Sequence, residues 1–253
     1  MAFNDNRGSF LSSIPVVTKN LLIINVLLWL ATFVMKNKGI DLTQYLGLHF
    51  WKGDSFNLAQ LVTYMFMHDT SSFSSGIVHI FCNMFNLWMF GIVLERAFGY
   101  KRYLTYYLVC GVGAALVQEL VWQFTWVNDV AGLLNISVAE AEKLIAAGSI
   151  SDLSMFLNDA YVTVGASGAV FGILLAFGMT FPNMRMFIIP FPFPIKAKWM
   201  VMGYGAIELF FGVTGTVSGV AHFAHLGGML FGFFLIMYWK KKGIIGSGGY
   251  GYM

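Results

Sequence analysis

Six apolar stretches, divided by polar or charged segments, are the feature that most constrains the fold of this chain. About 20 apolar residues cross the hydrocarbon core of a bilayer as an α-helix, because each helical residue adds about 1.5 Å. We expect spans at about 21–36, 77–95, 103–126, 162–181, 199–213 and 219–239, the first beginning near Val16. This pattern predicts an all-α membrane protein, a bundle of six transmembrane helices.

The composition also indicates a membrane protein. The chain is 58% hydrophobic and 11% charged, and its mean hydropathy is +0.71. These values exclude an ordinary soluble domain. The two cysteines, Cys82 and Cys110, fall within expected spans, so we interpret both as small buried apolar residues rather than a disulfide. No motif predicts a cofactor.

If six helices alternate, most cations fall on the side of the bilayer that holds both termini. These cations are Arg7, Lys19, Arg96, Lys101, Arg102, Arg185, Lys196, Lys198, Lys240, Lys241 and Lys242. Cytoplasmic loops carry the excess of Lys and Arg, so both termini are expected in the cytoplasm. The positive charge therefore needs no nucleic-acid partner. We expect an integral multi-pass protein of the cell (inner) membrane.

The chain divides into segments by charge and apolarity. In order, they are a cytoplasmic N-terminal segment (1–15), a six-helix membrane domain (16–239) with a first loop (about 37–76) and a long outer loop (about 127–160), and a basic, then glycine-rich, cytoplasmic tail (240–253). In the outer loop, Ser137 and Glu140 have the spacing of a capping box, which predicts a short amphipathic helix. Residues 1–20 lack the apolar core of a cleavable signal peptide.

Ser167 and His225 stand near the starts of the fourth and sixth expected spans. Both spans enter the bilayer from the outer side, and each residue lies about six positions in, or about 9 Å deep. Polar groups are costly in a membrane and therefore indicate function. A serine hydroxyl becomes a good nucleophile when a base takes its proton. The pair predicts hydrolysis within the membrane; the alternative for Ser167 is a packing role only.

The second expected span brings His79 and Asn83 to the same depth, on one face of a helix because they are four residues apart. In acyl transfer the carbonyl oxygen becomes an oxyanion, and each hydrogen-bond donor placed there contributes about 3 to 4 kcal/mol. Asn83, His79 and the backbone N–H of Ser167 are suitable donors. A hydrogen bond to the first loop is the alternative role for His79.

Two pairs of glycines have the GxxxG spacing that lets helices approach closely in lipid. They are Gly168 with Gly172 in the fourth span, and Gly228 with Gly232 in the sixth. We expect these two helices to pack together, which would bring the serine to the histidine.

Other ionisable residues within the spans have several interpretations. Glu119 and Glu208 would each be costly there, and three roles stay open for each: orienting a histidine as the third member of a triad, a proton or ion pathway, and a structural hydrogen bond between helices. His222 precedes His225 by three residues and shares its face.

A metal site formed by the histidines is a further alternative. His222, His68 and His79 would be its ligands, but the chain has no local spacing such as HExxH, so no metal site is expected. His49 and His68 are instead expected at solvated or interfacial positions.

These residues resemble motifs of the rhomboid family of intramembrane serine proteases. The motifs are Gly165-Ala166-Ser167-Gly168, His225-Leu226-Gly227-Gly228 with Gly232, His79-Ile80-Phe81-Cys82-Asn83, and Gly91 with Glu95-Arg96. The resemblance covers about 15–239. It implies a six-helix rhomboid-like bundle, a Ser167–His225 dyad open to water from the outer side, and substrates that are transmembrane segments of other proteins, entering past the fifth helix.

The resemblance also implies roles for the surrounding residues. Asn83, His79 and Gly165 would bind the oxyanion or the substrate; Gly168, Gly172, Gly228 and Gly232 would pack the helices; Phe171 would support the base. Phe171 stands where some members have a tyrosine, and Trp51-Lys52 only partly matches the Trp-Arg pair of many first loops. The rival interpretations are a non-catalytic relative that binds membrane helices and a transporter, although no inverted repeat is visible.

Overall fold

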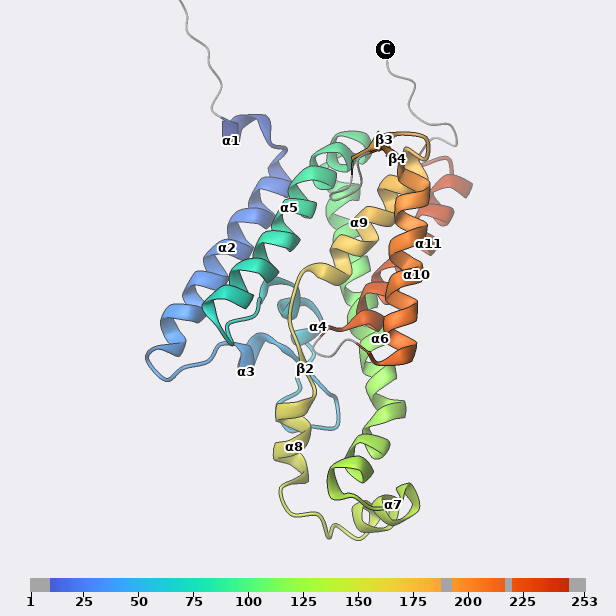
Figure 1. Ribbon diagram of the computed structural model, residues 1–253. Helices are drawn as coiled ribbons and strands as arrows, with labels where there is room; N and C mark the ends of the chain where they lie inside the picture. Colours follow the sequence, from blue (N-terminus) through green and yellow to red (C-terminus); the bar gives the residue numbers. More distant parts are fainter. Residues whose placement is uncertain (1–9, 188–192, 217–219, 246–253) are drawn as a thin grey trace, which may run out of the picture.

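The computed structural model describes residues 10–187, 193–216 and 220–245. Six long helices form a bundle within these residues (Figure 1). They are α2 (Val16–Lys36), α5 (Phe73–Phe98), α6 (Tyr100–Leu134), α9 (Ser167–Thr180), α10 (Ala197–Thr214) and α11 (His222–Lys241). Helices α2, α5, α6 and α11 are each long and apolar enough to cross a membrane, and α9 is a shorter apolar helix. The predicted all-α membrane bundle is confirmed.

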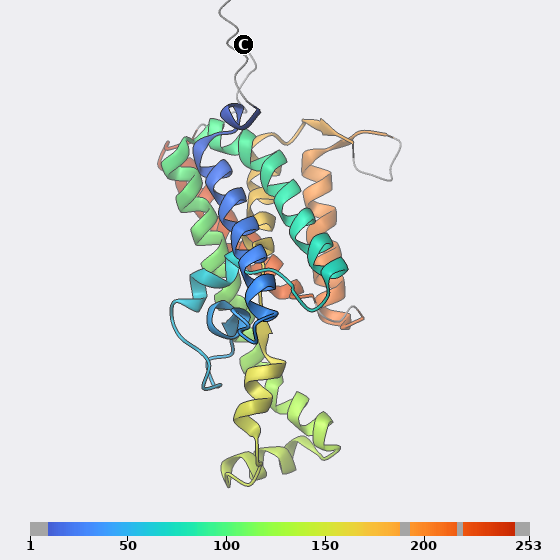
Figure 2. The same cartoon turned by 90° about the vertical axis from the view of Figure 1, so that its left-hand side faces the viewer.

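Helix α9 lies inside the bundle, with other long helices around it (Figures 1 and 2). Most of its residues are buried, from Gly168 to Gly178, because the helix is apolar on all sides. Lys240, at the end of α11, donates a hydrogen bond of 3.2 Å to the carbonyl oxygen of Met179 in the last turn of α9. A cation at that end also complements the helix dipole.

The fourth predicted span begins later than expected. Helix α9 starts at Ser167, whereas the sequence predicted a span from about 162, so Ser167 is the first helical residue and not the sixth. The preceding residues are extended, since β2 (Val162–Thr163) pairs antiparallel with β1 (Leu48–His49). The sixth helix likewise starts at His222, which places His225 in its first turn.

The second and third predicted spans are longer than expected. Helix α6 has 35 residues, or about 52 Å, well beyond the roughly 30 Å of a hydrocarbon core. Its far end carries an outer lobe with α7 (Val138–Ala146) and α8 (Leu153–Ala160), at the opposite end of the molecule from α1 (Phe10–Ser13) (Figure 1). The predicted capping box is confirmed, because Ser137 and Glu140 cap α7 reciprocally.

Short elements of the first loop pack against the half of the bundle that lies nearer α7 and α8. They are α3 (Thr43–Leu46), β1, α4 (Gln60–Thr63) and the 3₁₀ turn η1 (Tyr64–Phe66). The Glu119 carboxylate, on α6, accepts a hydrogen bond of 3.0 Å from the backbone N–H of Trp51. Of the roles open for Glu119, the structure therefore places it in a structural hydrogen bond that holds this loop.

At the other end, Glu95 of α5 caps the start of α2. Its carboxylate accepts hydrogen bonds from the backbone N–H groups of Val17 (2.9 Å) and Thr18 (2.7 Å), which lack partners within their own helix. Arg96 donates to the carbonyl oxygen of Ser13 at 2.9 Å. A small hairpin, β3 (Arg185–Met186) with β4 (Ile195–Lys196), leads into α10 at this same end. Pro190 and Pro192, which stand between the two strands in the sequence, lie outside the described residues.

Candidate active site

Ser167 is placed by the sharp change from extended chain to helix just before it. Gly165 has φ +131°, a backbone conformation that L side chains rarely adopt. Its N–H donates to the carbonyl oxygen of Tyr64 at 3.0 Å, so the extended segment stays hydrogen-bonded inside the bundle. Because Ser167 starts α9, its N–H is among those that a helix leaves without an intrahelical partner, at the positive end of the helix dipole.

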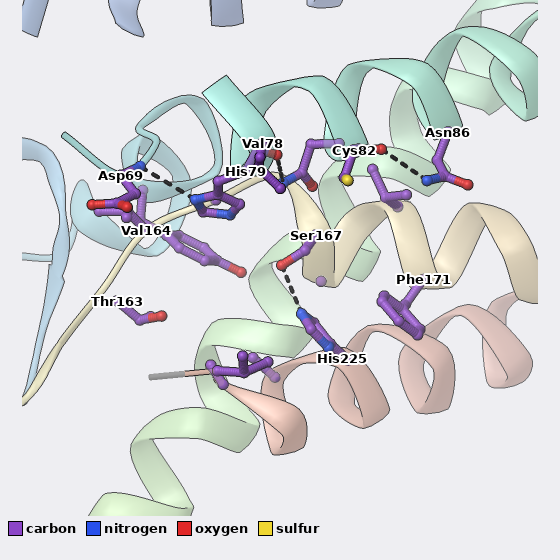
Figure 3. A pocket seen from close by; sticks show the side chains of 18 of the residues that line it. Asp69, Val78, His79, Cys82, Asn86, Thr163, Val164, Ser167, Phe171 and His225 are labelled. Atoms are coloured by element: carbon purple, nitrogen blue, oxygen red, sulfur yellow. Dashed lines mark hydrogen bonds between the residues drawn. The ribbon is translucent and has the colours of Figure 1, made fainter. Parts of the chain in front are cut away.

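His225 contacts the serine directly. Its Nε2 lies 2.8 Å from the Oγ of Ser167, which is a hydrogen-bond distance (Figure 3). The two residues come from α11 and α9, whose predicted close approach is present at Gly168 and Gly228. The serine and histidine singled out in the sequence are therefore brought together.

Phe171 lies one turn after Ser167 and stacks on the imidazole of His225. The ring centroids are 4.3 Å apart and the planes differ by 6°. The support that Phe171 was expected to give the base therefore takes the form of ring stacking. It fixes the plane of the imidazole from one face, while the Ser167 hydrogen bond fixes one edge.

Glu208 of α10 occupies the other edge of the imidazole. Its Oε2 lies 2.9 Å from Nδ1 of His225 and 2.7 Å from Nδ1 of His222. A carboxylate only accepts hydrogen bonds, so both Nδ1 atoms donate to it. All three residues are buried. Of the three roles left open for Glu208, the geometry fits two: a hydrogen bond between helices and contact with a histidine.

His79, on α5, is held by the first loop and faces the serine. The backbone N–H of Asp69 donates to its Nδ1 at 3.2 Å, so in the neutral ring Nε2 carries the proton (Figure 3). A Cβ built on Gly165 would lie 3.0 Å from this Nε2. The two alternatives for His79 thus coexist: one nitrogen bonds the loop and the other lies near the site as a donor.

Asn83 lies one turn further along α5, as the spacing of four residues predicts. One Nδ2 proton goes to the carbonyl oxygen of His79 at 3.0 Å. The other Nδ2 proton remains available for a ligand. The side chain is buried, and both Asn83 and His79 line the cavity that holds Ser167 and His225.

This cavity has a volume of about 920 Å³. It is lined by side chains of α5, α9, α10 and α11 and by the extended segment at 162–165. Tyr204 of α10 and Cys82 of α5 belong to its apolar lining. The volume is in the range of pockets that bind organic ligands, and Ser167, His225, His79 and Asn83 all belong to its lining.

Three residues differ from their predicted environments. His49 and His68, expected at solvated or interfacial positions, are fully buried, because the first loop folds back on the bundle. Cys82, expected to be buried, is exposed on α5, while Cys110 is buried as predicted; both thiols are free. Sequence hydropathy gives no signal for these environments, since all three depend on how the loop and helices pack.

His68 packs against His79, with ring centroids 5.1 Å apart. Burial, together with the charge of the neighbouring His79, lowers the pKa of His68 to about 3. His68 is therefore neutral at ordinary pH and adds no charge beside the site. For the Asp69 carboxyl, burial acts to raise the pKa, but hydrogen bonds from Ser75 and Ser71 bring it below its usual value.

Comparison with known proteins gives one family. The Rhomboid domain model matches residues 55–242, more than half of the chain. "RHOMBOID-like protein 6, mitochondrial" from Arabidopsis thaliana is 28% identical over 176 residues, which cover 70% of this chain and 42% of that protein. "Rhomboid protease AarA" from Providencia stuartii is 27% identical over 161 residues, covering 62% and 50%.

The curated relatives are longer than the matched region, which spans half or less of each of these two proteins. The family match nevertheless covers the segment that holds the polar residues described above, which are His79, Asn83, Ser167, Glu208, His222 and His225. Together with the six-helix membrane bundle, it establishes that this chain belongs to the rhomboid family.

Proposed function

We propose that this chain is an intramembrane serine endopeptidase, with Ser167 as nucleophile and His225 as general base. The observation that supports the proposal most strongly is the 2.8 Å contact between Oγ and Nε2, in a cavity lined by the long apolar helices. General-base assistance is typically worth about 100-fold to 10,000-fold in rate. Family membership supports the same activity, since one matched relative is named a protease.

In the proposed reaction, His225 Nε2 takes the proton of Ser167 as Oγ bonds to a peptide carbonyl carbon. The tetrahedral intermediate then collapses, the C–N bond breaks, and Nε2 gives its proton to the leaving amine. In the second half, a water molecule attacks the acyl-enzyme while Nε2 takes its proton; the C–Oγ bond then breaks and Nε2 returns the proton to Oγ of Ser167. The proton transfer between Ser167 and His225 occurs within one existing hydrogen bond, so neither side chain has to move far for it.

The oxyanion of that intermediate would be held by Asn83, His79 and the backbone N–H of Ser167. The free proton of Asn83 and the Nε2–H of His79 come from one face of α5, and the backbone N–H comes from the start of α9. Each such donor contributes about 3 to 4 kcal/mol in a water-poor site. Gly165 leaves room for the substrate, because a side chain there would crowd His79.

The substrates we propose are transmembrane segments of other membrane proteins. A helix hides its peptide bonds in its own hydrogen bonds, so the segment must be locally unwound before Ser167 can reach it. The cavity is lined on one side by α5 and on another by α10 at Tyr204, which is consistent with entry past α10. The apolar lining suits apolar side chains of an unwound segment.

We also propose that the end of the molecule with α1 faces the cytoplasm. The cations at the end of α5, the start of α6, the start of α10 and the end of α11 all lie at that end (Figure 1). They are Arg96, Lys101, Arg102, Lys196, Lys198, Lys240 and Lys241. This arrangement follows the positive-inside rule and would open the site toward the outer side, where α7 and α8 lie.

The test uses the purified full chain with a fluorescent transmembrane substrate and a serine-reactive fluorophosphonate. We expect cleavage and labelling at Ser167 only, with both lost in Ser167→Ala and cleavage lost in His225→Ala. Ser149→Ala, in the outer lobe, is the matched control and should behave as wild type. Unaltered cleavage by Ser167→Ala would exclude this mechanism. Substrate binding without cleavage by the wild-type protein would favour a non-catalytic relative instead.

A further inference from the structure

Glu208 carries a carboxylate on the membrane helix α10, and only 9% of the residue is exposed. A charge in such a place is costly unless it is paired and hydrogen-bonded. Its Oε2 has two donors, Nδ1 of His225 at 2.9 Å and Nδ1 of His222 at 2.7 Å. Within the described residues, a continuous series of hydrogen bonds therefore links three helices: α10 through Glu208, α11 through His225, and α9 through Ser167.

We propose that Glu208 is a positioning residue that converts the serine–histidine pair into a three-member relay, with His222 holding the carboxylate in place. The inference rests on the proposed protease function and extends its two-residue mechanism.

The relay follows from the proton positions. The carboxylate accepts from Nδ1–H of His225, which leaves the lone pair of Nε2 facing the hydroxyl of Ser167. A neutral histidine without such an acceptor also populates the Nε2–H tautomer, which cannot take a proton from serine. When Nε2 receives the proton, the imidazolium donates on both edges, and the charge of Glu208 stabilises it.

His222 gives the carboxylate a fixed position. It shares the first turn of α11 with His225, and its Nδ1 binds the same oxygen from a second direction. Its ring lies against Phe211 of α10, with centroids 5.7 Å apart. The carboxylate is therefore anchored between α10 and α11 independently of the catalytic base.

The same three ligand atoms lie within 4.8 Å of one another, so a bound metal is the competing interpretation. Two ligands of one tetrahedral zinc, each about 2.0–2.1 Å from the ion, are separated by about 3.3 Å. The separations of 2.7 and 2.9 Å from Oε2 are shorter than this and match charge-assisted hydrogen bonds. The geometry favours a relay over a metal site.

The experiment compares steady-state kinetics of the purified wild-type protein with Glu208→Gln, Glu208→Ala and Glu208→Asp. We expect Gln and Ala to lower kcat by about 100-fold to 10,000-fold with KM little changed, as for loss of the acid in other serine triads. Asp, which restores the charge, should recover part of kcat. Fluorophosphonate labelling of Ser167 should slow in parallel.

A control at the same helix interface distinguishes the positioning role of Glu208 from a purely structural role. Met229 of α11 packs beside Gly205 of α10 and has no hydrogen-bond donor to offer a carboxylate, so Met229→Ala weakens this interface without removing a hydrogen-bond partner of Glu208. We expect it to lower the melting temperature without the loss of kcat. If Met229→Ala and Glu208→Gln lose kcat equally at equal loss of stability, the positioning role is overturned.

NMR of the ¹⁵N-histidine-labelled protein reports the tautomer directly. In wild type we expect the His225 Nδ1 to be protonated, assigned by its absence in His225→Ala, and in Glu208→Ala a mixture of tautomers. Wild-type kcat in Glu208→Ala would refute the relay and leave the protease proposal intact, whereas an inactive wild type would refute the protease itself. Loss of wild-type activity on chelation, restored by Zn²⁺, would overturn the relay in favour of a metal site.

Discussion

The carbonyl oxygen of Gly168 lies so close to Gly228 that a Cβ on Gly228 would overlap it. This contact joins α9 to α11 one residue after Ser167 and three after His225. Because neither glycine has a side chain, the two backbones approach closely enough for the serine and imidazole to meet. The separation of the two helices at this point therefore controls the distance between Oγ and Nε2.

We expect Gly228→Ala to push the two helices apart. An added methyl group in a packed interface costs about 1 to 3 kcal/mol, and a misplacement of about 1 Å at a reacting group costs about 100-fold in rate. The variant should melt at lower temperature and lose most cleavage. Gly203→Ala on α10, where a Cβ would meet nothing within 4 Å, is the control and should retain both. Wild-type activity in Gly228→Ala would show that this contact does not set the geometry.

Asn83→Ala removes one proposed oxyanion donor. We expect kcat to fall by about 100-fold to 1,000-fold with KM nearly unchanged, because the hydrogen bond strengthens only when the oxyanion forms. Asn86→Ala is the matched control. The Asn86 side chain also donates to the carbonyl oxygen four residues earlier, at 2.8 Å, but it lies further along α5 from the serine (Figure 3). Equal losses of kcat in both variants would argue against a specific role for Asn83.

Phe171→Ala should loosen the imidazole without removing any hydrogen bond. Stacked aromatic pairs contribute about 0.5 to 1.5 kcal/mol, so we expect kcat to fall by about 2-fold to 10-fold. Phe171→Tyr keeps the ring and should retain wild-type kcat. A Tyr variant as slow as the Ala variant would contradict a stacking role; single-turnover kinetics with both variants would measure it.

His68→Gln should reduce the acid sensitivity of the fold. The pKa of His68 is lowered to about 3 by burial and by His79, against about 6.5 in an unfolded chain, so below pH 6.5 the unfolded state binds more protons. The lowered pKa of His68 therefore leaves the free energy of unfolding unchanged above pH 6.5 and decreases it progressively between pH 6.5 and pH 3. At pH 5 the decrease is about 2 kcal/mol.

Denaturant unfolding of wild type and His68→Gln at pH 7 and pH 5 tests this directly. The difference between the two pH values should be smaller in the variant by that amount. Met67→Leu, a volume-conserving change at the buried neighbour, should keep the wild-type difference. An identical pH dependence in wild type and His68→Gln would show that folding does not lower the pKa of His68.

The two sequence motifs around Ser167 and His225 were sufficient to predict the serine–histidine contact, because polar residues are so rare in apolar spans that their positions stand out. The glycine spacing predicted the packing of the two helices, because small residues at this spacing let helix backbones approach closely in lipid. The i, i+4 relation of His79 and Asn83 needed only helix geometry.

The local start of α9 could not be predicted from hydropathy. Residues 162–166 are as apolar as the helix that follows, so the pattern extended the span through them. Pairing of Val162 with His49, more than 100 residues earlier, keeps this segment extended, and Gly165 permits the turn. A long-range strand contact leaves no periodic signal in either segment.

The sequence by itself determined that the chain is a bundle of membrane helices and which polar side chains enter it, since burial of apolar length in lipid depends on composition within each span. The tertiary structure alone decided which partners Glu119 and Glu208 take: one carboxylate holds a loop and the other meets two histidines. The partners of a buried charge depend on how the packed helices are rotated relative to one another. This rotation is defined only when side chains from separate helices come together in the assembled fold.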